Sequence, residues 1–390
     1  MTLPTDHYVL TQFIQESFGF ELPSSALAPF LRANQSGSQV RKFTRKYLAQ
    51  APYEAWITDC LEEEFARELD ALGLQAVHFA QQAKAISLSE ALTSYQIRPL
   101  DWATIPNNSH YFHPKINHGF WENFLLASSP SRVTGVHLSN QRGPMLAKSI
   151  LESRFFYALR RAFQLSFAVS ANAVRIDFGF SFGDGSVMHP APTRSEDYGL
   201  PGKRIRGTWA GSQLFFDSLG TDPPAMVDGG AAKQGLLSGD LEGVISSLAA
   251  TADSIFFIVP DSFPDLFVVG VPSERHRTLR LSASRAASTW PLTLSMLEPV
   301  LKCLAEGHRT LVLAQGGPAA SLIGLYLAHV VRTTLPTGLM HFLELGQALD
   351  HGVPNRLRGN FTSEHFQGSR APIFQSKRSL MPGIKVFISR

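Results

Sequence analysis

The sequence predicts an α/β protein with a Rossmann-like, mostly parallel sheet flanked by helices and preceded by a helical N-terminal region. Residues 311–350 read as strand, glycine turn, helix, strand and glycine turn, which is the pattern of a βαβ unit. Residues 254–260 form an apolar run closed by proline, which is typical of strands buried on both faces of a parallel sheet. Residues 174–182 place apolar side chains at alternate positions, which predicts a further strand with one buried face.

The composition indicates a globular chain. Of its 390 residues, 44% are hydrophobic and 17% are charged, so the chain can bury a large core. The net charge of +3 is compatible with anionic ligands but is too small to predict nucleic-acid binding. The two cysteines predict neither a disulfide framework nor a cysteine zinc site. We see no signal peptide and no membrane-spanning apolar stretch, so we expect a soluble, cytoplasmic protein.

Residues 1–100 are expected to be helical. Apolar residues follow helical spacing, most clearly in 56–72, and acidic residues are interleaved with them. The basic run at 41–46 is interpreted as a solvated helix face, with membrane-surface or partner binding as the alternative. We expect this region to form a cap or to join copies of the chain into a homo-oligomer.

The rest of the chain divides into three parts. Residues 101–150 are rich in proline, asparagine, histidine and aromatic residues, which predicts a loop-rich connection. Residues 151–355 hold the Rossmann-like domain, and residues 356–390 form a basic C-terminal tail with a possible last strand at 384–388. Helices are expected at 145–167, 236–250 and 291–307. Residues 191–250 are rich in glycine, proline and charge, and the basic cluster at 194–206 is interpreted as a loop, either ordered over an anionic site or simply solvated.

Histidines gather in the predicted connection. His110, His113 and His118 precede Glu122, but their spacing matches no strong zinc motif. Ordinary loop or cap histidines are the main interpretation. Metal binding and contact with an acceptor substrate are the alternatives.

The glycine turn of the βαβ unit is the expected ligand site. Its glycines permit a tight turn, Pro318 suits the first helical position, and the helix N-terminus offers N–H groups and a positive dipole end to an anion. The pattern is not GxGxxG, so a dinucleotide fingerprint is absent, and an ordinary α/β turn is the alternative. The residues assigned to nucleotide or phosphate binding are Gly316, Gly317, Ala319, Ala320 and Ser321, with Arg204 and Arg206 of the basic loop.

Two acids are the candidate catalytic residues. Glu344 ends the second strand of the βαβ unit, at the sheet edge where α/β proteins collect functional groups, and is a candidate general base or hydroxyl-binding group. Capping or pairing with an arginine is the alternative. Asp184 lies between two glycines, in a turn that can direct a carboxylate at a ligand or a metal ion. The alternative is a plain β-turn with Asp-Gly at its corner.

Three segments together resemble the GT-D type glycosyltransferases and related bacterial polysaccharide-cluster proteins. Residues 182–186 (FGDGS) are similar to that family's RFGDGE-like segment. Residues 316–319 (GGPA) are similar to its helix start, and residues 344–347 (ELGQ) to its strand end with an acid-x-Gly turn, in the same order. The resemblance covers roughly residues 170–355.

The resemblance implies a transferase that moves sugar from a sugar nucleotide to a polysaccharide, glycolipid or protein acceptor. Asp184 would then contact the sugar or a Mn²⁺ or Mg²⁺ ion. The chain departs from the family at Ser186, which replaces the second acid, and at Ser181, which replaces the arginine. Arg175 or an arginine of the basic loop is a substitute for that arginine. The acids that could complete the site are Asp177, Glu196 and Asp197.

Other readings remain open. One carboxylate holds a divalent cation poorly without other oxygen ligands, so the alternatives to a completed metal site are a metal-independent reaction and the loss of transfer activity. A nucleotide-binding, glycan-binding or assembly protein on the same fold is the second hypothesis. A methyltransferase using S-adenosylmethionine is the third, because an acid also ends the strand after its glycine turn.

Overall fold

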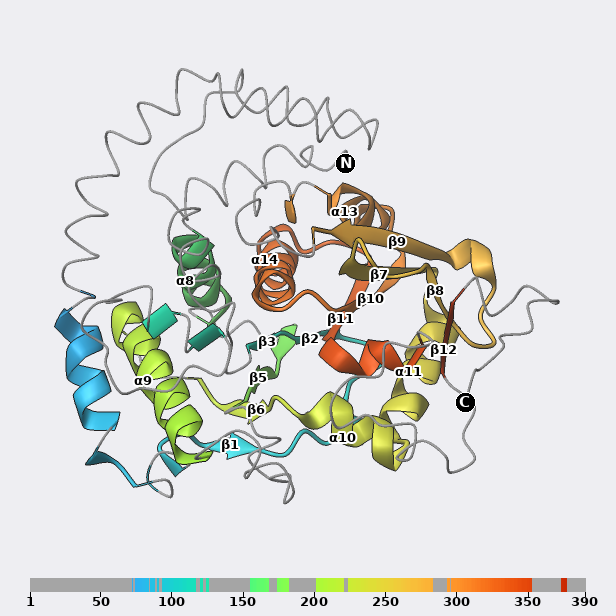
Figure 1. Cartoon of the computed structure of the whole chain (residues 1–390). Helices are drawn as coiled ribbons and strands as arrows, with labels where there is room; N and C mark the ends of the chain where they lie inside the picture. Colours follow the sequence, from blue (N-terminus) through green and yellow to red (C-terminus); the bar gives the residue numbers. More distant parts are fainter. Residues whose placement is uncertain are drawn as a thin grey trace, which may run out of the picture.

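Parallel strands with helices on both sides form the centre of the protein (Figure 1). The structure is a computed structural model, and the residues that it describes are 93–116, 155–167, 174–181, 201–220, 224–282, 296–352 and 373–376, with parts of 72–90, 120–125 and 293–294. The predicted α/β, Rossmann-like fold class is confirmed. Among the described residues, no helix has the length and apolarity needed to cross a membrane.

The described residues form three sheets, and in the two larger ones all neighbouring strands are parallel. The larger has the order β4-β2-β11-β10-β7-β9 and the smaller the order β1-β6-β5-β3. The strands of the larger sheet are β2 (His110–His113), β4 (Val174–Ile176), β7 (Ser254–Pro260), β9 (His276–Leu281), β10 (Arg309–Ala314) and β11 (Leu339–Glu344). The strands of the smaller sheet are β1 (Ile97–Arg98), β3 (Lys115–Ile116), β5 (Phe178–Phe180) and β6 (Met226–Asp228).

The two sheets are continuous, because two chain segments run from one into the other. β2 leads through Pro114 into β3, and β4 leads through Asp177 into β5, with the same pairing register on both sides of the transition. The backbone also pairs within the transition: Asp177 N–H donates to the Phe112 carbonyl at 2.9 Å, and Gly179 N–H donates to the Pro114 carbonyl at 2.8 Å. The protein therefore has one parallel ladder from β9 to β1.

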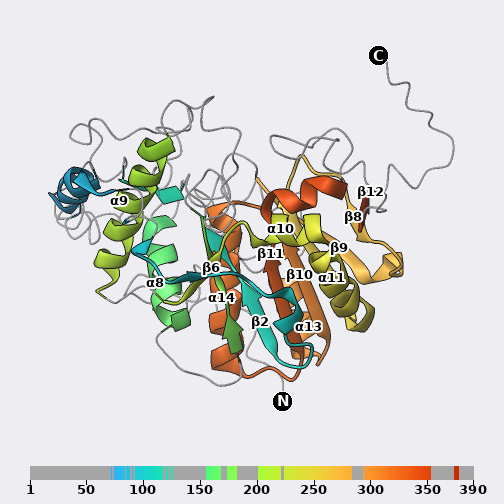
Figure 2. The ribbon, with the colours of Figure 1, turned by 90° about the horizontal axis from the view of Figure 1, so that it is seen from below.

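Helices cover both faces of this ladder (Figure 2). The helices on one face, here called the α14 face, are α8 (Phe155–Phe167), α9 (Pro201–Leu219), α13 (Glu298–Ala305) and α14 (Pro318–Thr334). The helices on the other, the α11 face, are α10 (Ala231–Ser238) and α11 (Asp240–Thr251). Strand side chains alternate between the two cores, so that Phe342 packs on the α14 face and Leu343 on the α11 face.

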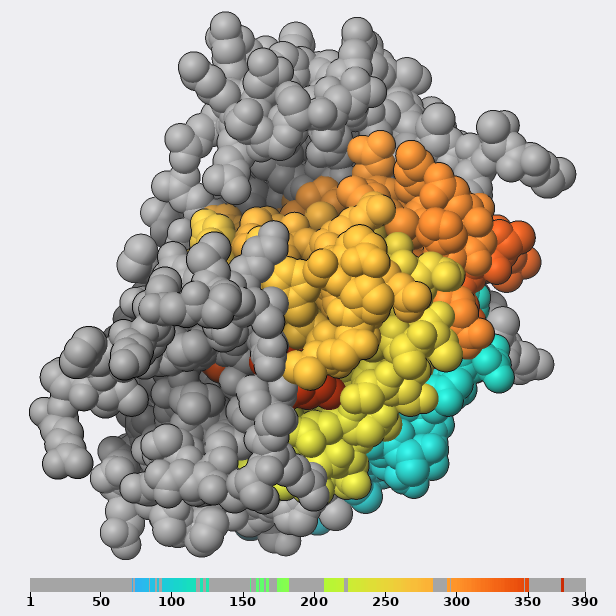
Figure 3. Space-filling model, turned by 90° about the vertical axis from the view of Figure 1, so that its right-hand side faces the viewer, coloured from blue at the N-terminus to red at the C-terminus, as the bar shows by residue number. Residues whose placement is uncertain are grey.

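Short elements complete the described structure. β8 (Leu266–Val268) pairs antiparallel with β12 (Phe374–Ser376). In Figure 3, β12 is the dark red segment between the gold surface, which includes β8, and the yellow surface of α10 and α11. The short 3-10 helices are η1 (Trp102–Thr104), η2 (Ser273–Arg275) and η3 (Gly346–Gly352). Part of the predicted tail therefore packs back on the body of the protein.

The βαβ unit predicted at 311–350 is confirmed as β10, α14 and β11. The loop-rich connection predicted at 101–150 is wrong for residues 110–116, which form β2 and β3 in the middle of the ladder. Pairing with β11 on one side and β4 on the other outweighs the weak strand propensity of this segment. The strand β1 likewise interrupts the region predicted to be helical.

Three further expectations differ from the structure. The single strand predicted at 174–182 is divided at Asp177 into β4 and β5. Residues 203–206 of the predicted basic loop lie in α9, which begins at Pro201, a residue suited to a first helical turn. The helix predicted at 236–250 is two helices, because Gly239 has a φ of 89° and ends α10. The N-terminal helices of the expected oligomer contact, up to residue 71, and the strand predicted at 384–388 lie outside the described residues.

Candidate functional site

Close packing of α14 on β11 builds the site. A Cβ atom at Gly324 would lie 2.5 Å from Cε1 of Phe342, so a larger residue would push the helix away from the strand. Ser321 lies one turn before Gly324 on the same side of the helix, and Glu344 points to the same face as Phe342. The glycine contact therefore brings Ser321 beside Glu344.

The carboxyl group of Glu344 is held by two segments. Glu344 is 2% exposed, and its Oε2 accepts hydrogen bonds from the Lys115 backbone N–H at 2.9 Å and from Ser321 Oγ at 2.9 Å. Ser321 Oγ also contacts the carbonyl oxygen of Lys115. A hydroxyl group has one hydrogen, so it donates to one of these oxygens at a time. When Glu344 is protonated, both contacts are hydrogen bonds at the same time: the carboxyl group donates to Ser321 Oγ, and the Ser321 hydroxyl group donates to the Lys115 carbonyl oxygen.

Burial raises the pKa of Glu344 from its ordinary 4.5 to about 7. The nearby Lys115 ammonium and the two hydrogen bonds lower this pKa, but they offset only part of the effect of burial. A carboxyl group with a pKa near neutrality exists in both protonation states under ordinary conditions. That property is what general acid–base chemistry requires.

Lys115 and Asp228 lie at the same carboxyl edge of the ladder. Burial lowers the pKa of Lys115, and the carboxylates of Glu344 and Asp228 act in the opposite direction. Asp228 ends β6, is 3% exposed and accepts the Gly230 N–H at 2.8 Å. The sequence analysis missed both residues. Asp228 is an acid followed by two glycines at the end of a strand, and this pattern could have identified it as a candidate site residue. Lys115 carried no such signal, because it lies in the segment that was predicted to be a loop.

Five of the residues predicted to bind phosphate, all except Arg204 and Arg206, lie together at the start of α14. Gly317 has a φ of 56°, which L side chains rarely adopt, and nothing lies within 4 Å of a Cβ atom added there. A Cβ atom at Gly316 would lie 2.3 Å from a leucine side chain. The N–H groups of Ala320 and Ser321 donate to the Gly317 carbonyl at 3.0 and 3.4 Å. Ala319 is buried, and the Ser321 hydroxyl points to Glu344, so this turn offers backbone rather than side chains to a ligand.

Asp184 lies outside the described residues, as do Glu196 and Asp197. The last described residue before Asp184 is Ser181, which follows β5 at the carboxyl edge of the ladder. Arg204 and Arg206 belong to the first two turns of α9, and their side chains are not among those described. Their assignment to the site stays a prediction.

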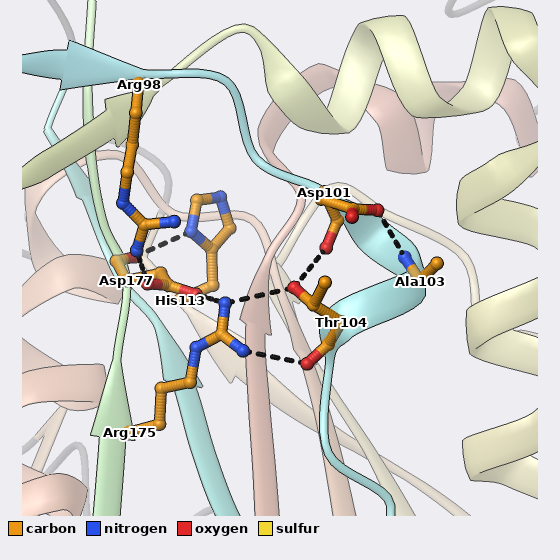
Figure 4. Close-up of polar contacts among 7 residues, drawn as sticks. All are labelled: Arg98, Asp101, Ala103, Thr104, His113, Arg175 and Asp177. Atoms are coloured by element: carbon orange, nitrogen blue, oxygen red, sulfur yellow. Dashed lines mark hydrogen bonds and ion pairs between the residues drawn. The ribbon is translucent and has the colours of Figure 1, made fainter.

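Asp177 forms an ion-pair cluster on the α11 face of the ladder (Figure 4). Its carboxylate is 2% exposed; Arg98 Nη2 lies 2.5 Å from Oδ1, and Arg175 Nη2 lies 2.7 Å from Oδ2. Arg175 also donates to the carbonyl and hydroxyl oxygens of Thr104. The cluster ties η1 to the ladder and links β1, the last strand of the ladder, to the transition between β4 and β5. These contacts argue against Asp177 as the second acid of the site and against Arg175 as its arginine, because each neutralises the other.

His110 and His113 lie in the strand β2 rather than in a loop or a helix cap, so the main interpretation of these two histidines is wrong about their location. His113 is completely buried, its Nδ1 lies 2.8 Å from the Asp177 carbonyl oxygen, and burial lowers its pKa to about 4. The ring is therefore neutral at pH 7. Within the described part of the chain, no group of three or more His, Cys, Asp and Glu side chains is placed to hold a metal ion. His118 and Glu122 lie outside that part.

The site joins a buried acid, a hydroxyl group and a lysine at the edge where open α/β sheets bind ligands. Comparison of the chain with models of known protein families, with curated proteins and with solved structures gives no match. The function is therefore argued from the site itself.

Proposed function

We propose that the protein is a glycosyltransferase that uses a sugar nucleotide as donor and a polysaccharide, lipid-linked glycan or protein as acceptor. The observation that carries this proposal is the buried carboxyl group of Glu344, whose pKa is raised to about 7 at the end of β11. Such a group can accept the proton of an acceptor hydroxyl at neutral pH. The start of α14, one strand away, offers a positive dipole end to the donor's diphosphate.

The sequence resemblance adds support, because two of its three segments meet in space. The GGPA segment begins α14, the ELGQ segment ends β11, and the Ser321–Glu344 hydrogen bond joins the two elements. The third segment begins in sequence directly after Ser181, which follows β5 at that edge, and lies outside the described residues. Mn²⁺ or Mg²⁺ binding would use Asp184 and oxygen atoms of the donor, because the described residues supply too few ligands. A bound ion would neutralise charge on the diphosphate.

In the proposed reaction the acceptor hydroxyl oxygen attacks the anomeric carbon of the donor sugar. The new glycosidic bond forms as the bond from that carbon to the diphosphate oxygen breaks, and the diphosphate leaves with the electron pair. The hydroxyl proton passes to Glu344. The protein contributes by positioning the two substrates and by stabilising the charge on the leaving group.

Strand order argues against the methyltransferase hypothesis. In that fold, further strands of the sheet normally follow the acid along the chain. Here the neighbour of β11 is β2, which precedes the βαβ unit in sequence, and β12 pairs with β8 outside the ladder. A binding or assembly protein on the same fold is the second candidate, and Ser186 in place of the family's second acid favours it.

Substitution of the two acids tests the proposal. Glu344→Gln and Asp184→Asn are each expected to abolish sugar-nucleotide turnover while circular dichroism shows an intact fold. Glu306→Gln, at an exposed position after α13, is the matched control and should retain activity. Turnover that survives both active-site changes would exclude the assignment. Calorimetric binding of sugar nucleotides without turnover, whatever acceptor is offered, would support the binding protein instead.

A further inference from the structure

Lys115 occupies a slot between two glycines. A Cβ atom at Gly346 would lie 2.5 Å from Lys115 Nζ, and a Cβ atom at Gly179 would lie 3.1 Å from Lys115 Cβ and 3.2 Å from Cγ. Gly346 also has a φ of 53°, so glycine is favoured there for two reasons. The side chain therefore passes along β5 and places its ammonium group at the turn that follows β11.

Within the part of the chain that the structure describes, the ammonium group of Lys115 has no direct counter-ion. Among the described residues, no carboxylate oxygen lies within ion-pairing distance of Nζ. Glu344 accepts the backbone N–H of Lys115, and its charge acts on the ammonium only from a longer distance, as does that of Asp228. An unpaired ammonium that is partly shielded from water attracts an anion more strongly than one in bulk solvent.

The same lysine lies beside the first turn of α14. Its carbonyl oxygen contacts Ser321 Oγ, and β3 packs against α14. The ammonium group and the positive end of the helix are thus at one edge of the ladder, with open space beyond Gly317. An anion that spans more than one phosphate group could contact both.

We propose that Lys115 is the cationic subsite of this edge and binds the pyrophosphate group of the ligand through its ammonium. The assignment rests on the proposed sugar-nucleotide site and names the side chain that receives the departing diphosphate. Glu344 then has the separate role of accepting the proton of the acceptor hydroxyl group. The two functions are separated on β11 and on β3, the strand that continues β2, the neighbour of β11, beyond Pro114.

Calorimetric titration of the full chain with pyrophosphate tests this assignment. Lys115→Met keeps the length of the side chain and removes its charge, and it is expected to weaken pyrophosphate binding by about tenfold or more. Lys302→Met, at a position 71% exposed on α13, is the control and should bind as the wild type does. Inorganic phosphate should bind more weakly than pyrophosphate to the wild type. Equal binding of pyrophosphate to Lys115→Met and wild type, or of both anions to wild type, would overturn the proposal.

Lysine labelling supplies a test without a substitution. Reductive methylation followed by mass spectrometry should modify Lys115 less when pyrophosphate is present, whereas Lys302 should react equally in both samples. Equal labelling of Lys115 in both samples would contradict the assignment. Sugar-nucleotide turnover in the Lys115→Met variant at the wild-type rate would remove Lys115 from the site and leave the transferase proposal standing. If pyrophosphate protects Lys115 from labelling but no sugar-nucleotide turnover is found, Lys115 keeps its place in the anion site and the transferase proposal fails.

Discussion

Replacing Glu344 by glutamine removes a group whose ionisation destabilises the folded state. The pKa of Glu344 is about 7 in the folded protein, against an ordinary value of 4.5. Because the folded pKa is raised, the fold favours the protonated carboxyl group, so this stabilisation is fully present below about pH 4.5 and is lost as pH rises through about 7. The shift of about 2.5 units corresponds to a loss on the order of 3 kcal/mol above neutrality.

Urea denaturation of the wild type and of Glu344→Gln at about pH 5 and about pH 8 measures this effect. Any effect of the amide group that does not depend on pH is equal at both pH values. The change with pH in the difference between the free energies of unfolding of the variant and the wild type therefore reports the ionisation of Glu344. We expect the variant to gain about 2–3 kcal/mol relative to the wild type over this interval. Glu306→Gln should give no pH-dependent difference, since that side chain is exposed. A difference between Glu344→Gln and wild type that is equal at both pH values would refute the raised pKa.

Two glycine pairs test the packing by urea denaturation. Gly346→Ala and Gly270→Ala should each lower the free energy of unfolding by about 1 kcal/mol, because both glycines have positive φ. Gly346→Ala should add little to that loss, because its Cβ atom would meet Lys115 Nζ, the far end of a flexible side chain that can move away. A loss for Gly346→Ala that exceeds the loss for Gly270→Ala by about 1 kcal/mol or more would show that the ammonium group cannot move. Gly211→Ala in α9 should destabilise by about 2 kcal/mol or more, since its Cβ atom would lie 2.0 Å from a backbone oxygen. A Cβ atom at Gly243 in α11 would meet open space, so Gly243→Ala should raise the free energy of unfolding by up to about 1 kcal/mol. If Gly211→Ala and Gly243→Ala changed the free energy of unfolding in the same direction, the packing described here would be contradicted.

The features predicted correctly from sequence are those with a strong local signal. The βαβ unit combines a long helical pattern with strands ended by glycine turns, and β7 is apolar throughout because both of its faces are covered by helices. The placement of Glu344 at the carboxyl edge followed from the same signal. In each case local pattern and tertiary packing agree.

The features that the sequence did not reveal depend on distant contacts. β2 and β3 are held in the ladder by strands from elsewhere in the chain, and Pro114 between them reads as a loop signal. Lys115 is placed at the site by Gly179 and Gly346, which lie far from it in sequence. Asp177 looked available as a ligand-binding acid until its two arginine partners were known. No periodicity encodes such contacts.

A structure of crystals soaked with uridine diphosphate or guanosine diphosphate, together with Mn²⁺ or Mg²⁺, tests the central claim most directly. We predict density for the diphosphate at the Gly316–Gly317 turn, within hydrogen-bond distance of Lys115 Nζ and beside the Glu344 carboxyl edge. Nucleotide bound at another part of the chain, with the turn left empty, would contradict the account.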